Sequence, residues 1–249
     1  AVNFRIRFDD CFLQRFGRPA IGLIVAAYLL IVLIGPLAAL AVEISKIGLG
    51  RALSALASEN ALAALQMTAI LTALSVSINC VVGTLGAIAI VRHRFPGRKI
   101  VDALADLPLA VSPVMIGLAF ILLFGRGGLF SPLLVAADIK VVFAFAGLLL
   151  GTLFVLLPFT LREVAYVLEE LGTSEEEAAA TLGASPFQIF WRVTLPNIRF
   201  GLGYGLLMTL ARSIGEFGAV LVLGGSISGH TQTATTFIHA AIEERDMAS

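Results

Sequence analysis

The chain has 249 residues, of which 58% are hydrophobic and 14% are charged, and its formal net charge at pH 7 is zero. A soluble domain carries about 25% charged residues, so this composition excludes an ordinary water-soluble domain. The zero net charge gives no electrostatic support to a nucleic-acid partner. The abundant apolar runs predict an all-α integral membrane protein, a polytopic helical bundle in contact with membrane lipid, rather than a barrel.

Five apolar runs are long enough to cross about 30 Å of hydrocarbon at about 1.5 Å per residue. The predicted spans cover residues 20–42, 61–91, 101–124, 141–161 and 200–224. Residues 1–19 precede them as a basic N-terminal tail. The first run is longer than the core of a cleavable signal peptide, so we expect it to be retained as a span.

The distribution of positive charge predicts the topology. The basic tail, the loop "RHRFPGRK" at 92–99 and the segment 162–199 are expected in the cytoplasm, and residues 225–249 on the opposite side. The final stretch contains "ATTFIHAAIEER", which has a helical pattern but precedes no apolar run. Either the chain stops outside the membrane or a sixth span is missing from this sequence, and we favour the second interpretation.

The segment between the last two spans has the pattern of two short helices joined at a glycine. Ser174, followed three residues later by Glu177, is typical of a capping box at the start of the first helix. Gly183 suits the left-handed conformation that ends a helix. Ser185 is predicted to cap the second helix, with Pro186 at its first position. A later proline opens or kinks the entry to the next span.

Residues 174–196, called the elbow below, also contain a spaced pattern of particular residues. The pattern consists of Glu177, Ala178, Ala179, Gly183, Val193, Leu195 and Pro196. It resembles the "EAA" motif of bacterial ABC-importer permeases, with Val193 where Ile is common. The resemblance implies coupling helices that dock into a groove on a cytoplasmic ATPase. From the residues alone, a structured cytoplasmic loop without a partner is the alternative.

Two further segments are similar to the sulfate, molybdate and tungstate branch of these permeases. They are "DLPLAVSP" at 106–113 and "ARSIGEFGA" at 211–219. The continuation "GGSISGHTQTATT" is more similar to the sulfate subunits than to the molybdate subunits. The resemblance implies a type I ABC-importer permease fold, with residues 20–249 as one permease domain, and ATP-driven import of sulfate or thiosulfate. The alternatives are a molybdate or tungstate permease and, with less support, an ATPase-independent anion channel or transporter.

The same resemblance implies the partners. They are a second permease subunit, with a heterodimer favoured, two cytoplasmic ABC ATPase subunits that bind ATP and Mg, and an extracytoplasmic anion-binding protein. The chain contains no G-x-x-x-x-G-K-[ST] sequence, so we expect a permease without its own ATPase site, catalytic residues or cofactor. Its three histidines lack ligand partners at a useful spacing, so no metal site is expected. The expected location is a bacterial inner membrane, crossed several times, with the N-terminus in the cytoplasm.

Two charged side chains lie inside the fifth apolar run. Arg212 and Glu216 are four residues apart and share one helix face. An intramembrane charge costs at least about 2.5 kcal/mol on insertion scales. The favoured interpretation is a mutual ion pair that locks this helix against a neighbour. The alternatives are a positive lining for an oxyanion, with Glu216 holding Arg212, and a gate contact across a dimer interface.

The third run contains two more candidates for a substrate path or gate. Asp106 lies four residues after Asp102, and the pair is either interfacial at a helix start or part of a gate or latch. Ser112 precedes Pro113, where a kink is expected to free carbonyl groups. These carbonyls or the Ser112 hydroxyl could then line the path.

Small and polar residues in the spans predict contacts between helices. Close packing, rather than ligand binding, is expected at Gly83, Gly86, Gly201, Gly203 and Gly205. Contacts with other helices are expected for Gln66, Ser75, Ser77 and Asn79, because lipid would leave their polar groups unsatisfied.

Overall fold

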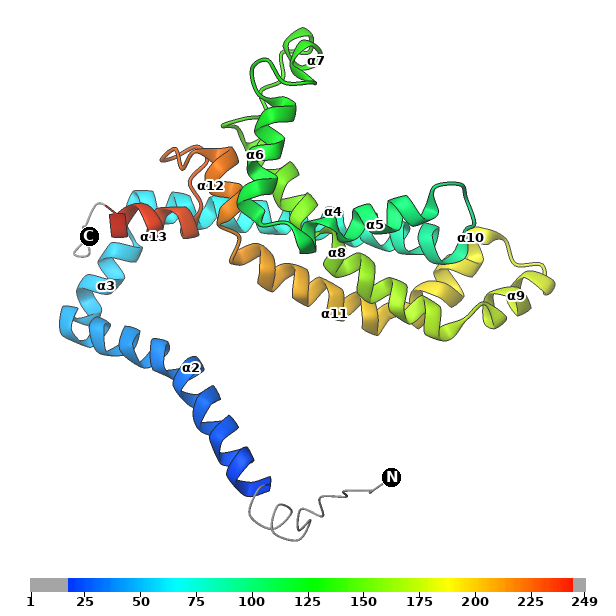
Figure 1. Ribbon diagram of the computed structural model, residues 1–249, viewed down its shortest axis with the longest axis horizontal. Coiled ribbons are helices and arrows are strands. Elements are labelled where there is room, and N and C mark those ends of the chain that lie inside the picture. The colour runs from blue at the N-terminus through cyan, green and yellow to red at the C-terminus, as the bar shows by residue number, and fades with distance from the viewer. Residues whose placement is uncertain (1–17, 244–249) are drawn as a thin grey trace, which may run out of the picture. The chain divides into compact units, whose positions relative to one another are not determined.

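The computed structural model describes residues 18–243, and every regular element in this range is a helix (Figure 1). In chain order they are α2 (Arg18–Ile47), α3 (Leu49–Leu56), α4 (Glu59–Arg92), α5 (Arg98–Ala110), α6 (Pro113–Phe124), α7 (Ser131–Ala136), α8 (Phe145–Leu171), α9 (Ser174–Thr181), α10 (Pro186–Ile189), the π-helix η2 (Phe190–Thr194), α11 (Leu195–Ile214), α12 (Gly218–Gly224) and α13 (Ala234–Glu243). The all-α class is confirmed for this range. Most of the predicted tail 1–19, and residues 244–249 of the outer stretch, lie outside it.

The chain divides into two compact units, one ending at Ala57 and the other beginning at Ser58. Unit 1 contains α2 and α3. The side chains of α2 from residue 21 to residue 47 are all exposed, although nearly all are apolar. A helix that is apolar on every side is typical of a membrane span. Unit 2 contains all the other helices and both candidate sites described below.

Among residues 18–243, three helices are long and apolar enough to cross a membrane, at Ile21–Ile47, Glu59–Arg92 and Phe145–Leu171. Two bent pairs of helices raise the number to five if each pair is one span. These elements coincide with the five predicted runs and support several membrane crossings. The sequence predicted a kink at Ser112 and Pro113 within the third run, and the structure shows how strongly each pair bends.

The predicted third span, 101–124, is wrong as a single helix. The helix axis bends by 119° between α5 and α6. Val111 and Ser112 both have extended backbones at the break, and the residue before a proline is disfavoured in the helical region. The Ser112 hydroxyl then caps α6 by accepting a hydrogen bond from the N–H of Met115 at 3.5 Å. The expected kink is therefore a sharp turn with its own cap.

The boundaries of the fourth and fifth spans also differ from the prediction. Helix α8 continues to Leu171, so the predicted start of the loop at residue 162 is wrong. Charged residues end an apolar run but do not end a helix, and α8 stops only at Gly172, whose φ is +65°. Helix α11 starts at Leu195 and bends by 53° into α12.

Helices α4, α8 and α11 form the core of unit 2. The largest buried apolar cluster consists of Ala87, Ile90, Ala105, Leu161, Val164, Ala165, Leu168 and Ile198. Polar contacts also join these helices: Thr160 and Thr209 share a hydrogen bond of 2.9 Å, and Asn79 donates to the carbonyl of Leu153 at 3.4 Å. Ser75 and Asn79 are buried as predicted, whereas Gln66 and Ser77 are exposed, so the prediction is wrong for the latter two within this chain.

Glycines allow α8 to approach its neighbours closely. A Cβ atom on Gly83 would lie 3.0 Å from the Cβ of Thr160, and one on Gly205 would lie 3.1 Å from the Cα of Thr160. The same test confirms close packing at Gly86, against Leu161, and at Gly201, against Val167. The prediction is wrong for Gly203, around which the described part of the chain leaves open space within 4 Å.

The two α11 glycines provide a matched test of this packing. We expect Gly205→Leu to destabilise the subunit by about 1–3 kcal/mol, because the added side chain meets the backbone of α8. Gly203→Leu should not destabilise it, since no described neighbour lies in the way. Thermal unfolding of the detergent-solubilised subunit measures both effects. Equal stability of the two variants would contradict the proposed α8–α11 contact.

Candidate coupling elbow and translocation cleft

The elbow lies at one end of unit 2, and α12 and α13 lie at the other (Figure 1). Its glycine and its second cap agree with the prediction. Gly183 has a φ of +84°, a conformation that other residues rarely adopt. Ser185 accepts a hydrogen bond from the N–H of Gln188, whose side chain accepts one from the N–H of Ser185 at 2.9 Å. This reciprocal capping box fixes the start of α10.

Two details of the elbow differ from the prediction. Ser174 is the first residue of α9 rather than its cap, and the hydroxyl of Thr173 donates to the Glu177 carboxylate at 2.6 Å. The second helix also does not end before the next span, because residues 186–214 form one helix that includes η2. Pro196 stands in the first turn of α11. A proline cannot donate to the carbonyl four residues earlier, and the wider π turn before it accommodates this loss.

Three large apolar side chains of the elbow are exposed, and we call them the elbow patch: Leu182, Phe187 and Trp191. Leu182 is 89% exposed and Phe187 is 72% exposed. Phe187 and Trp191 form an edge-on aromatic pair with ring centroids 6.1 Å apart. Next to the patch, Ala178 and Gly183 are exposed. Exposed apolar side chains gathered on a polar segment are typical of a protein-binding surface.

Acidic residues of α9 hold the elbow against its own chain. Glu175 accepts a hydrogen bond from Asn197. Glu176 accepts one from the buried Thr194 hydroxyl at 2.8 Å and pairs with Arg92 at 2.9 Å. Among the motif residues, Leu195 packs against the main apolar cluster. These contacts attach the elbow to the membrane helices and leave the elbow patch exposed.

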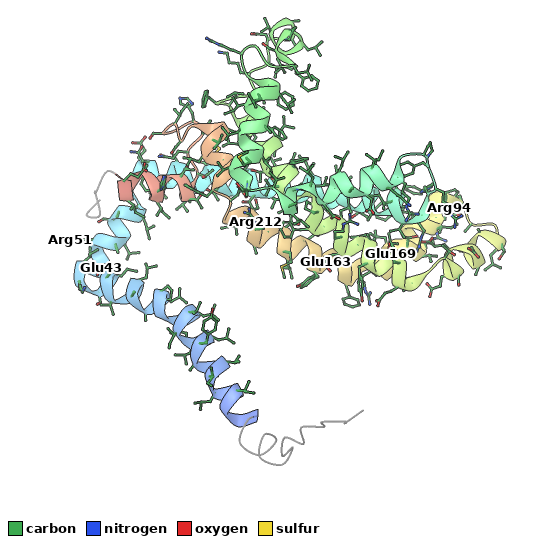
Figure 2. The ribbon with its side chains drawn as sticks, in the orientation of Figure 1. Glu43, Arg51, Arg94, Glu163, Glu169 and Arg212 are labelled. Atoms are coloured by element: carbon green, nitrogen blue, oxygen red, sulfur yellow. The ribbon has the colours of Figure 1, made fainter. Side chains whose placement is uncertain are left out.

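A cleft lies beside the break between α5 and α6. It has a volume of about 300 Å³ and is lined by Pro108, Leu109, Ala110, Val111, Ser112, Pro113, Val155, Phe159 and Arg212. Two of the predicted path residues, Ser112 and Arg212, therefore border one cavity. Figure 2 places Arg212 near the middle of unit 2, well away from the elbow.

The predicted ion pair in the fifth run is confirmed. Arg212 Nη1 lies 2.6 Å from Glu216 Oε2, although that N–H is not aligned for a hydrogen bond. The Glu216 side chain is 1% exposed, whereas that of Arg212 is 32% exposed. The other oxygen of Glu216 accepts the N–H of Ala219 at 3.1 Å and caps α12. The carboxylate is thus fully enclosed, and the guanidinium remains open on the cleft side.

A second arginine clamps α8 to α5. Arg162 Nη1 lies 2.7 Å from Asp102 Oδ1, and Arg162 Nε lies 2.6 Å from Asp106 Oδ1. A further hydrogen bond of 2.9 Å runs from Arg162 Nη2 to the backbone carbonyl of Asp102. The structure therefore places Asp106 in a helix–helix clamp and not among the residues that line the cleft.

Comparison with known proteins agrees with this architecture. Residues 81–246 match the family described as binding-protein-dependent transport system inner membrane component. The sulfate transport system permease protein CysW of Synechococcus elongatus is 45% identical over 87% of this chain and 76% of its own length. The sulfate transport system permease protein CysT of Escherichia coli K12 is 35% identical over 88% of this chain and 79% of its own length. The chain belongs to the binding-protein-dependent permease family.

A solved structure supports the permease fold. The crystal structure of a bacterial ABC transporter involved in alginate import contains a chain that superposes with a TM-score of 0.80. The match covers 95% of this permease and 87% of that chain at 19% identity, so it speaks for the fold alone. The expected helical permease fold is thereby confirmed. The family match also covers the elbow, the cleft and the Arg162 clamp.

Sequence reasoning missed two arginines of this permease. Arg92 and Arg162 entered the prediction only as positive charges at the ends of apolar runs. Each is held by carboxylates distant in sequence, Arg92 by Glu176 and Arg162 by Asp102 and Asp106. A partly buried cation requires a partner, but neither the burial nor the partner helix could be read from the sequence.

The Arg162 clamp can be measured by a double-mutant cycle. We expect Arg162→Gln and Asp106→Asn to show a coupling energy of about 1 kcal/mol, a modest value because both side chains are partly exposed. Unfolding of the permease in mixed detergent micelles gives the four stabilities. A parallel cycle with Arg199→Gln should be additive, because Arg199 lies over the Phe200 ring rather than beside Asp106. Additivity in both cycles would contradict the clamp.

Proposed function

We propose that this permease is the transmembrane subunit of an ATP-driven importer of sulfate or thiosulfate. The observation that carries the proposal is its 45% identity, over most of both chains, to a permease of a sulfate transport system. The exposed elbow patch supports the coupling part, since it presents an apolar surface that a cytoplasmic ATPase could bind. The guanidinium of Arg212 is partly exposed, which supports an anion as the transported substrate.

The complete importer has several subunits under this proposal. A second permease subunit completes the pathway, and a heterodimer is favoured because both CysW and CysT relatives are similar to this chain. Two cytoplasmic ATPase subunits bind ATP and Mg, and an extracytoplasmic binding protein delivers the anion, in keeping with the family description. The complex lies in a bacterial inner membrane with the permease N-terminus in the cytoplasm.

Transport then proceeds by alternating access. Closure of the ATPase dimer around ATP moves the elbow, and the elbow moves the helices that border the cleft. Arg212 attracts the oxyanion, and the nearby Glu216 carboxylate limits this attraction so that the anion can leave again. The Ser112 hydroxyl offers a neutral hydrogen bond at the same cavity.

Uptake of labelled sulfate tests the substrate. Cells that lack the gene should regain sulfate uptake when the full-length gene is restored, and excess molybdate should not compete. Vanadate should abolish the uptake, because an ATPase drives it. Restored uptake that molybdate suppresses would move the substrate to molybdate or tungstate, the alternative within this branch. Uptake that persists with vanadate would indicate an ATPase-independent channel or transporter.

Arg212 provides a test of the anion path. We expect Arg212→Gln to lower sulfate uptake about tenfold while the complex stays assembled, because the cleft loses its positive charge. Arg212→Lys should keep more of the uptake, since it keeps that charge. Both variants are measured for uptake and for co-purification of the partner subunits. Loss of the assembled complex in both Arg212 variants would show that the Arg212–Glu216 ion pair only locks α11 against a neighbour.

A further inference from the structure

Arg92 is the last residue of α4, and its side chain is almost enclosed although it begins the basic loop. Its exposed fraction is 12%, and that of its partner Glu176 is 22%. The next arginine of the loop, Arg94, is exposed. Figure 2 shows Arg94 at the elbow end of unit 2. Two arginines of one loop thus have very different surroundings, and only one of them is built into the elbow.

The guanidinium of Arg92 closes the end of α8. Nη1 donates to the carbonyl of Leu168 at 3.0 Å, and Nη2 donates to the carbonyl of Gly172 at 2.6 Å. The last carbonyls of a helix have no donor within the helix, and a positive charge is favourable at that end. The two bonds need a planar fork with separate donors, which arginine has and lysine lacks.

The third nitrogen of the same guanidinium holds the elbow. Nε lies 2.9 Å from Glu176 Oε2 in the first turns of α9, an ion pair whose N–H is not aligned for a hydrogen bond. The other oxygen of Glu176 accepts from the hydroxyl of Thr194 in η2. One side chain of α4 therefore connects the end of α8 with both helical parts of the elbow.

The space left around this junction is too small for a ligand. It amounts to about 10 Å³, close to the volume that one water molecule requires. Gly172 lines this space and separates α8 from α9. Its φ is +65°. Without a clamp, this glycine would be a free joint between the membrane helix and the elbow.

We propose that Arg92 is a positioning residue that makes the elbow move as one body with α4 and α8. The inference rests on the proposed function, in which an ATPase displaces the elbow. With Arg92 in place, displacement of α9 is transmitted to α4 and α8, two of the three helices that form the core of unit 2. Without it, the joint at Gly172 absorbs the displacement, and ATP is hydrolysed without transport.

The test uses the whole importer reconstituted in vesicles with its binding protein. Arg92→Gln should leave the subunits assembled and keep ATP hydrolysis within about twofold, yet lower uptake per ATP roughly tenfold, because elbow displacement no longer reaches α4 and α8. Arg92→Lys should show a smaller loss, because it keeps the charge but not the fork. Glu176→Gln, which preserves the side-chain shape, should uncouple in the same direction.

Arg94→Gln is the matched control and should change neither activity. The proposal is overturned if uptake and ATP hydrolysis fall in proportion in both Arg92 variants, because Arg92 would then serve only assembly. It is also overturned if uptake per ATP stays unchanged in both Arg92 variants and in Glu176→Gln.

Leu182→Glu separates this outcome from failure of the proposed function. It places a charge on the elbow patch, at the opposite end of α9 from Glu176, and should release the ATPase from the complex. If Leu182→Glu retains both the ATPase and transport, docking through the elbow patch is what fails. If Leu182→Glu loses the ATPase while the Arg92 variants couple normally, the elbow docks but Arg92 does not position it.

Discussion

The structure depends on one constraint: a backbone group in hydrocarbon needs a partner within the protein. Continuous helices meet this need, and the two helix breaks of unit 2 must meet it in another way. At the first break the Ser112 hydroxyl caps α6, and at the second the Glu216 carboxylate caps α12. A Cβ atom on Gly218 would lie 3.1 Å from the backbone nitrogen of Val114, so the two helix starts pack against each other. The two breaks thus lie in one region of unit 2, where the starts of α6 and α12 pack together and the cleft opens.

The contacts of α8 and α11 change between the middle of unit 2 and the elbow. The change follows from how polar groups are satisfied in each place. Near the middle, small residues and hydroxyl groups allow close contact and neutral hydrogen bonds, as between Thr160 and Thr209. Toward the elbow, ion pairs are added to the apolar packing, as where Arg92 of α4 pairs with Glu176 of α9. A membrane helix that leaves hydrocarbon can keep its hydrogen bonds while its surface changes from apolar to charged. For this reason α8 continues for ten residues past the predicted span without any change in backbone.

Interactions between residues that are close in sequence were predictable, whereas pairings between residues that are distant in sequence were not. The ion pair of Arg212 with Glu216 followed from a spacing of four residues, and the cap at Ser185 followed from the proline after it. The end of α8 was placed too early because hydropathy reports the edge of the hydrocarbon and not the end of a helix. The sharp turn at Ser112 was underestimated as a kink, since the sequence shows that a proline interrupts a helix but not how far the chain then turns.

The pairings of Arg92 and Arg162 lay beyond the sequence because their partners come from other helices. A single apolar run has a weak periodicity signal when nearly every residue in it is apolar, so the facing sides of α4, α5 and α8 could not be read. The elbow motif includes Glu177, and it carries no signal for the contacts that Glu176 makes with other helices. In the structure Glu177 bonds to the adjacent Thr173, whereas Glu176 reaches Arg92 and Thr194.

The number of engaged nitrogens distinguishes the roles of the three arginines. Arg92 and Arg162 each use all three guanidinium nitrogens on carbonyl or carboxylate oxygens, so they have become parts of the scaffold. Arg212 contacts its carboxylate partner through Nη1, is partly exposed and borders the cleft. A cation that is fully satisfied gains little from an anion, whereas one that is partly satisfied gains new charge-assisted hydrogen bonds. The same side-chain chemistry therefore fixes helices at two positions and leaves the third guanidinium partly exposed beside the cleft.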